Sequence, residues 1–266
     1  MNTDTAGDEI EQAAQRLTEA RLAVDVVDSL KSAAPSDVAA AYRTADRHAE
    51  LLGWDVIGWK VGCTSERAQE ILSCPHPFAG RIFDGTAYGS KTLPHDALTK
   101  PLLESEFVFT LGAPLPPRDT PYTAAEVHEA TATVAPAFEL VSSRYSDWLA
   151  VGYPSLIADS GCNGGIVMGE PVPVAQCPNL ADVAVTLEVD GAEISSGTGS
   201  DILGDPWDAL VWLANHLSER GIGLAAGELV MSGTCTGADP LPEGSTATAS
   251  FAGLGEVTVS RTIPDQ

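Results

Sequence analysis

Two patterns of hydrophobic positions divide the chain. Residues 8–32 are rich in Ala and charged side chains, and their apolar positions recur at helical spacing. A second helix is predicted to begin at Ser36, as its N-cap, and to end at Gly53. The pattern therefore predicts an N-terminal helical segment over residues 1–54 and a different kind of body over residues 55–266.

The body alternates short apolar runs with turns that contain Gly or Pro, which is typical of many short β-strands. The dipeptide Asp190-Gly191 predicts a tight hairpin. One helix interrupts the strands, with Asp205 and Pro206 at its start and Gly221 at its end. We predict an α+β fold, with a mixed β-sheet body that forms effectively one structural domain with the helical segment. The predicted strands lie in DVIGWKVG, RIFDGTAYG, LLESEFVFTLG, VAPAFELV, GGIVMGEPVPV, VAVTLEVDGAEI, GELVMSGT and GEVTVSR.

One of these runs carries two carboxylates. In LLESEFVFTLG, Glu104 and Glu106 are separated by one residue, so a strand places both side chains on the same face. Two ionised carboxylates on a buried face repel each other and are costly to desolvate. The pair therefore requires Lys or Arg partners, solvent at a sheet edge, or a divalent cation.

Composition narrows these alternatives. The chain of 266 residues has 44% hydrophobic residues and a formal charge of -23, with 37 acidic against 14 basic residues. Such a charge argues against nucleic acid and anionic membranes as partners. Basic side chains are scarce as neutralising partners. Glu139, in VAPAFELV, adds a third carboxylate from another predicted strand, and three carboxylates suit Mg²⁺ or Mn²⁺.

The cysteines and apolar runs bear on localisation. Five scattered cysteines without a CxxC pair argue against a disulfide framework and suit a reducing cytosol. The polar, acidic start differs from a signal peptide, and no apolar run approaches the roughly 20 residues that span a bilayer. We expect a cytoplasmic protein.

Several motifs in order resemble one family. Glu104-Ser105-Glu106, then PAFE ending at Glu139, then SSRYSDW, are similar to the E-x-E…P-A-x-E…S-R-x-x-D-W pattern of the 2-keto-4-pentenoate hydratases. These belong to the fumarylacetoacetate hydrolase superfamily, which also includes the 4-oxalocrotonate decarboxylases. GWKVGCTS, ADSGCNGGIVMG, DPWDALVWLANHL and GELVMSGTCTGADPLPEG resemble further family segments, so the likeness runs from about residue 41 to 261.

The resemblance implies a fumarylacetoacetase C-terminal type of β-roll or sandwich and a metal centre. It implies that Glu104, Glu106 and Glu139 bind Mg²⁺ or Mn²⁺, which chelates a small 2-oxo acid. Lys60, one of only four lysines, would bind the substrate carboxylate or relay a proton, with a pKa lowered by burial beside the cation. Asp84 is a second catalytic candidate, although RIFDGT differs from the family pattern there. Expected substrate contacts come from one turn: Ser232, Gly233, Thr234 and Thr236.

The chain departs from the family at a few positions. Gly161 and Cys162 stand where Ala or Ser is common, and Ser142 replaces a frequent Asp. These changes leave the carboxylates intact but affect inference about the particular substrate. His76 lies in a loop that suits either a lid or a plain solvated position. The sequence shows no His-Glu pair of the kind that superfamily hydrolases use to activate water.

We therefore expect a metal-dependent lyase that adds water to a 2-hydroxy-2,4-dienoate and gives a 4-hydroxy-2-oxo acid. The alternatives are a 4-oxalocrotonate-type decarboxylase, an acylpyruvate-type C–C hydrolase and a catalytically silent scaffold. A homo-oligomer is expected, because superfamily relatives are oligomeric and because the apolar side chains of the 206–217 helix exceed what one small body would cover.

Overall fold

The computed structural model describes residues 3–89 and 92–264. Its helices are α1 Thr3–Ala23, α2 Val38–Leu52, α3 Glu66–Leu72, α4 Ala124–Ala130, α5 Tyr153–Ala158 and α6 Pro206–Glu219. Its strands are β1 Val56–Gly62, β2 Phe78–Phe83, β3 Thr92–Leu93, β4 Leu102–Leu111, β5 Thr131–Val141, β6 Asn163–Met168, β7 Val172–Pro173, β8 Ala184–Val189, β9 Ala192–Thr198, β10 Leu229–Pro240, β11 Thr246–Phe251 and β12 Gly255–Arg261.

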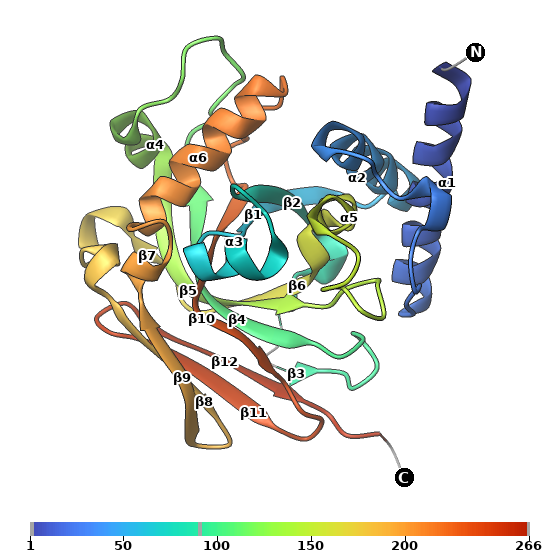
Figure 1. The fold of residues 1–266 in the computed structure, drawn as a ribbon. Coiled ribbons are helices and arrows are strands. Elements are labelled where there is room, and N and C mark those ends of the chain that lie inside the picture. The colour runs from blue at the N-terminus through green and yellow to red at the C-terminus, as the bar shows by residue number, and fades with distance from the viewer. Residues whose placement is uncertain (1–2, 90–91, 265–266) are drawn as a thin grey trace.

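The strands form two mixed sheets. A seven-stranded sheet has the order β2-β1-β10-β4-β5-β6, with β7 paired to β5, and a five-stranded sheet has the order β3-β12-β11-β8-β9. The sheets pack through their faces, where the rings of Phe107 on β4 and Phe251 on β11 meet edge to face with centroids 5.1 Å apart. Figure 1 shows the five-stranded sheet below and most of the helices above. The predicted α+β fold with N-terminal helices is confirmed.

Helices lie on two sides of the larger sheet. In Figure 1, α1 and α2 lie together at one side, and α4 and α6 lie at the other. α1 packs onto the body, because its Ala13 and Leu17 share a buried cluster with Val141, Leu156 and Cys162. The boundary predicted between residues 54 and 55 stays a prediction. Among the described residues, the helices are too short or too polar to cross a bilayer.

Several local predictions are confirmed. Gly53 ends α2 in the left-handed conformation, with φ 63°. Asp205 caps α6 and accepts a hydrogen bond from the Trp207 N–H. The hairpin between β8 and β9 turns at Asp190-Gly191. Helix ends and tight turns depend on residues close together in the sequence, so the sequence was sufficient to predict these three.

Other local predictions are wrong. α1 ends at Ala23 rather than continuing to residue 32, and only a short 3₁₀ turn follows at Lys31–Ala33. The N-cap of α2 is Asp37 in place of Ser36, because its carboxylate accepts the Ala40 N–H at 2.7 Å. RIFDGTAYG is not one strand, since β2 ends at Phe83 and the backbone turns through Asp84–Thr86.

Candidate metal centre

Strand register brings the three glutamates together. β4 and β5 are antiparallel, and Glu104 lies directly opposite Glu139. Glu106 follows on the same face of β4, opposite Thr234 of β10. One oxygen from each of the three carboxylates lies within 4.8 Å of the others. The fold therefore brings the three carboxylates into one cluster that could hold a cation.

Lys60 completes the cluster from β1. Its side chain is buried, and Nζ lies 3.1 Å from Glu139 Oε2 and donates to the Gly161 carbonyl oxygen at 3.1 Å. Gly161 has φ 65°, which strains other residues, and a Cβ there would lie 3.0 Å from Lys60 Cδ and press against that side chain. The departure from the family at Gly161 thus lies directly against the ammonium.

Burial and charge shift the pKa values of these groups. Burial works to lower the pKa of Lys60, but Glu139, Glu104 and Glu106 outweigh it and raise that pKa above the usual value. That direction holds for the cluster without a cation, so the lowered pKa expected for Lys60 beside a bound cation stays a prediction. Burial, opposed by Lys60 and reinforced by Glu139, raises the pKa of Glu104 to about 7. Burial, with Glu139 and Glu104, raises the pKa of Glu106 well above its usual range.

The cluster fits a divalent cation. Glu106 Oε1 is buried and has no hydrogen-bond partner within the described residues, while Oε2 accepts the Gly233 N–H at 2.8 Å. The cluster contains three carboxylates and only one ammonium, that of Lys60, so ionising all three requires additional positive charge. Oxygen donors of this kind match Mg²⁺ or Mn²⁺, which take a few carboxylates and complete their shell with water or substrate oxygens.

The turn that was expected to bind substrate makes hydrogen bonds within itself and one to Glu106. Ser232 is fully buried, and its Oγ accepts the Phe107 N–H and donates to the Gly233 carbonyl oxygen. Thr234 Oγ1 donates to the Gly237 carbonyl oxygen and accepts two N–H groups of the same turn. Thr236 Oγ1 is buried without a partner in the part of the chain described here. Substrate contact by this turn stays a prediction.

Asp84 is not brought to the cluster. β1 and β2 pair Val56 with Phe83 and Lys60 with Gly80, so Asp84 lies beyond the opposite end of that strand pair. Its side chain is exposed, and its N–H donates to the Asp55 carbonyl oxygen at 2.9 Å. A catalytic role for Asp84 stays a prediction without a supporting contact. His76 is also exposed, and its Nδ1 lies 3.0 Å from the Pro77 carbonyl oxygen.

Asn163 was not among the residues predicted from the sequence, yet its Nδ2 donates to Glu139 Oε1 at 2.9 Å. The buried ion pair between Arg144 and Asp159 was not predicted either. The available signal for Asn163 was a polar residue among small ones, in SGCNGG, directly before an apolar strand. Because its partner is distant in the sequence, that signal does not indicate what Asn163 contacts.

Comparisons with known proteins agree with this architecture. Residues 78–260 match the family described as fumarylacetoacetate (FAA) hydrolase C-terminal. The chain is 34% identical over 228 residues to a 2-keto-4-pentenoate hydratase of Paraburkholderia xenovorans, covering 84% of each chain. It is 32% identical over 256 residues to the 2-keto-4-pentenoate hydratase of Paraburkholderia phymatum, covering 94% of this chain and 97% of the relative.

A solved structure is similar over nearly the whole chain. The 4-oxalocrotonate decarboxylase from Pseudomonas putida G7, complexed with magnesium and adipate, has a TM-score of 0.87 and 26% sequence identity. The match covers 96% of this chain and 97% of the decarboxylase. The chain therefore belongs to the fumarylacetoacetate hydrolase family, and within it to the group of 2-keto-4-pentenoate hydratases and 4-oxalocrotonate decarboxylases.

Proposed function

We propose that this protein is a divalent-metal-dependent lyase that adds water to a 2-hydroxy-2,4-dienoate and gives a 4-hydroxy-2-oxo acid. The observation that carries the proposal is the carboxylate cluster of Glu104, Glu106 and Glu139 with the Lys60 ammonium buried against it. The hydratases named above support hydration, and the magnesium in the related decarboxylase supports a divalent metal.

The three glutamates would hold Mg²⁺ or Mn²⁺, with Glu106 oriented by the Gly233 N–H. When bound, the cation would supply a Lewis acid for the 2-oxo and carboxylate oxygens of the substrate and favour negative charge on the former. We expect Mg²⁺ or Mn²⁺ from the all-oxygen donor set.

Lys60 is the acid/base candidate. The 2-hydroxyl of the dienol must lose its proton and C5 must gain one to give the conjugated 2-oxo acid. Addition of water then places a hydroxyl on C4 and a proton on C3. The Lys60 ammonium, buried against Glu139, would lie beside a substrate chelated at the carboxylate cluster, which makes it the candidate donor of the proton at C5. Its Nζ is held in place by Glu139 and the Gly161 carbonyl oxygen.

Decarboxylation is the second candidate, because the similar decarboxylase structure covers 96% of this chain. Loss of CO₂ from a 4-oxalocrotonate would use the same delocalisation of charge onto the 2-oxo group. Incubation with 2-hydroxypenta-2,4-dienoate and separately with 4-oxalocrotonate, followed by mass spectrometry, distinguishes the two reactions. We expect a product that has gained one water from the dienoate, whereas a product that has lost CO₂ from 4-oxalocrotonate, without hydration of the dienoate, would favour the decarboxylase.

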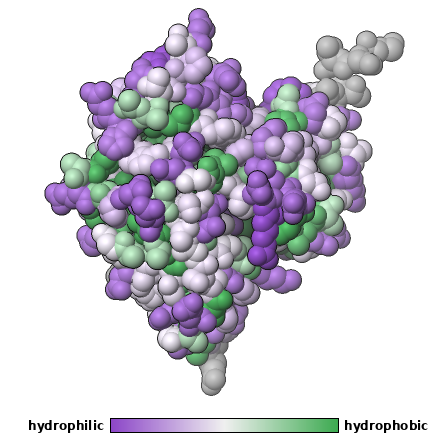
Figure 2. All heavy atoms as spheres, turned by 60° about the vertical axis from the view of Figure 1, so that its left-hand side comes forward, coloured by the Kyte–Doolittle hydropathy of each residue, from purple (hydrophilic) through white to green (hydrophobic). Residues whose placement is uncertain are grey.

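We also propose that the protein works in the cytoplasm as a homo-oligomer in the catabolism of aromatic compounds. The free thiols of its cysteines support a reducing compartment. The sequence argument for assembly is weaker than expected, because α6 already buries Leu210, Leu213 and Leu217 within one chain. Hydrophobic side chains form several small groups on the face shown in Figure 2.

A further inference from the structure

Asn163, at the start of β6, contacts the carboxylate cluster through the oxygen of Glu139 that Lys60 does not touch. Its Nδ2 donates to Glu139 Oε1 at 2.9 Å, while Lys60 Nζ lies 3.1 Å from Oε2. An ionised carboxylate only accepts hydrogen bonds, so the amide nitrogen of Asn163 must face it. The two partners together restrain Glu139 at both carboxylate oxygens.

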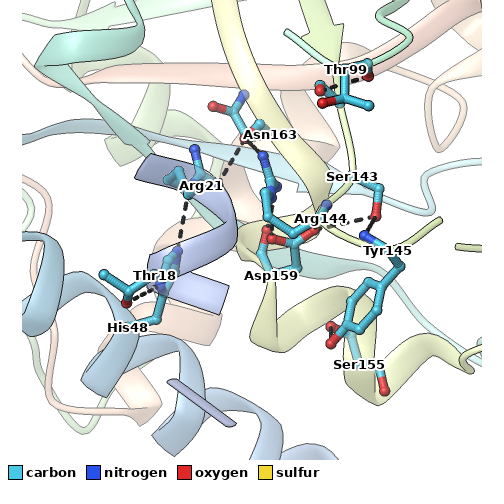
Figure 3. Close-up of polar contacts among 12 residues, drawn as sticks. Thr18, Arg21, His48, Thr99, Ser143, Arg144, Tyr145, Ser155, Asp159 and Asn163 are labelled. Atoms are coloured by element: carbon cyan, nitrogen blue, oxygen red, sulfur yellow. Dashed lines mark hydrogen bonds and ion pairs between the residues drawn. The ribbon is translucent and has the colours of Figure 1, made fainter. Parts of the chain in front are cut away.

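The backbone of Asn163 is held from behind. Its carbonyl oxygen accepts from Arg21 Nη2 at 2.9 Å and from Arg144 Nη1 at 3.1 Å. Both guanidinium groups are buried, with side chains converging on Asn163 in Figure 3. Arg144 is itself paired with Asp159, and Arg21 Nε donates to His48 Nε2 at 3.3 Å. Through Arg21 and His48, α1 and α2 are thus linked to the backbone that carries the Asn163 amide side chain.

The contact with Glu139 has an energetic cost. Asn163 is fully buried, and its Oδ1 has no hydrogen-bond partner within the described residues. Leaving a buried acceptor unsatisfied is destabilising. An apolar side chain of the same size would remove that unsatisfied oxygen but also the donor to Glu139 Oε1, so the amide contributes the hydrogen bond to Glu139 at this position.

We propose that Asn163 is a positioning residue that orients Glu139 as a ligand in the metal centre. This inference rests on the proposed function, because it presupposes that the glutamates bind a cation. Residues that hydrogen-bond to metal ligands without touching the metal typically contribute about 10–100-fold in metal affinity or activity. Asn163 fits that description by its contact and by the rigidity of its backbone.

The test is Mn²⁺ affinity, measured by the electron paramagnetic resonance signal of free Mn²⁺ during titration of the chelator-stripped full-length protein. Asn163→Ala removes the donor, and Asn163→Leu removes it while keeping the volume and eliminating the unsatisfied oxygen. Both variants should raise the Kd for Mn²⁺ by about 10–100-fold. The control is Ser142→Ala, which deletes a half-buried hydrogen bond to the Thr99 carbonyl oxygen and should leave the Kd unchanged.

The outcomes separate this inference from the proposed function. Failure of the wild-type protein to bind Mn²⁺ would overturn the metal centre and, with it, this role. Tight binding by the wild type with the same Kd in a folded Asn163→Leu variant would overturn the positioning role alone. A loss of folding in both Asn163 variants would also contradict it, because the residue would then serve stability. Circular dichroism and thermal unfolding of each variant establish which case applies.

Discussion

The Lys60 ammonium lies 3.1 Å from Glu139 Oε2, and both side chains are buried. Lys60 comes from β1 and Glu139 from β5, which are separated in the sheet by β10 and β4. The ion pair therefore extends across the carboxylate cluster. Breaking such a pair by removing one partner leaves an uncompensated buried charge.

Lys60→Met should lower kcat by about 10²–10⁴-fold, the usual contribution of a positioned acid or base. If Lys60 only anchored the substrate carboxylate, KM would rise and kcat would stay nearly constant. Steady-state kinetics and deuterium incorporation at C3 and C5, followed by NMR, distinguish these cases. Lys31→Met, at an exposed lysine, is the control. Wild-type kcat and unchanged deuterium incorporation in Lys60→Met would exclude an acid/base role.

Replacing Glu104, Glu106 or Glu139 with Gln should abolish metal-dependent activity and preserve the fold. Gln keeps the shape of the side chain but removes the charge on which cation affinity depends. Calorimetric titration with Mg²⁺ and Mn²⁺ should show a Kd raised more than about 100-fold, beyond the usual effect of an outer partner. Glu188→Gln, at an exposed position of β8, should bind the ions as the wild type does. Retained affinity in all three cluster variants would place the cation elsewhere.

Gly233→Ala should destabilise the protein and weaken metal binding together. Gly233 has φ 102°, and a Cβ would lie 2.1 Å from Thr64 Oγ1, so the N–H that orients Glu106 would move. Backbone strain of this kind costs about 1–3 kcal/mol. Gly227→Ala is a matched control, because its φ is 89° but a Cβ there meets no atom within 4 Å. Urea unfolding should show a lower free energy of unfolding in both variants. Titration with Mn²⁺ should show a lower affinity only in Gly233→Ala.

His48 should make the folded state sensitive to acid. Burial first, and then Arg21 and Arg144, hold the pKa of His48 well below its usual value in the folded protein. The unfolded chain therefore binds more protons at this residue, and the free energy of unfolding falls as the pH drops below about 6.5. When the pH is lowered through this value, the free energy of unfolding should fall less in His48→Gln than in the wild type. Urea unfolding on either side of this pH measures both losses. Equal losses in both proteins would contradict the assignment.

Features that are set by local interactions could be predicted from the sequence. The alternation along LLESEFVFTLG placed Glu104 and Glu106 on one face, and the structure has that arrangement. The α4 helix was missed although its capping box, Thr123 with Glu126, is visible in the sequence. The helix has only 7 residues and follows a loop rich in Pro, so the capping box alone did not lead to its prediction.

The remaining features depend on contacts between distant segments. The opposition of Glu104 and Glu139 is set by the register of β4 and β5, which the hydrophobic pattern does not specify. The contact of Asn163 with Glu139 depends in addition on how β6 is held by Arg21 from α1. The three carboxylates that surround Lys60 come from β4 and β5, so the raised pKa of its ammonium in the cation-free cluster also depends on distant segments.

The most direct test of the central claim is hydration by the full-length protein as a function of bound metal. Chelator-stripped protein is titrated with Mg²⁺ in the presence of 2-hydroxypenta-2,4-dienoate, and the product is identified by mass. We predict that a product heavier by one water appears in proportion to metal occupancy and that excess EDTA abolishes its formation. Hydration at the same rate in the stripped, EDTA-treated protein would contradict the account.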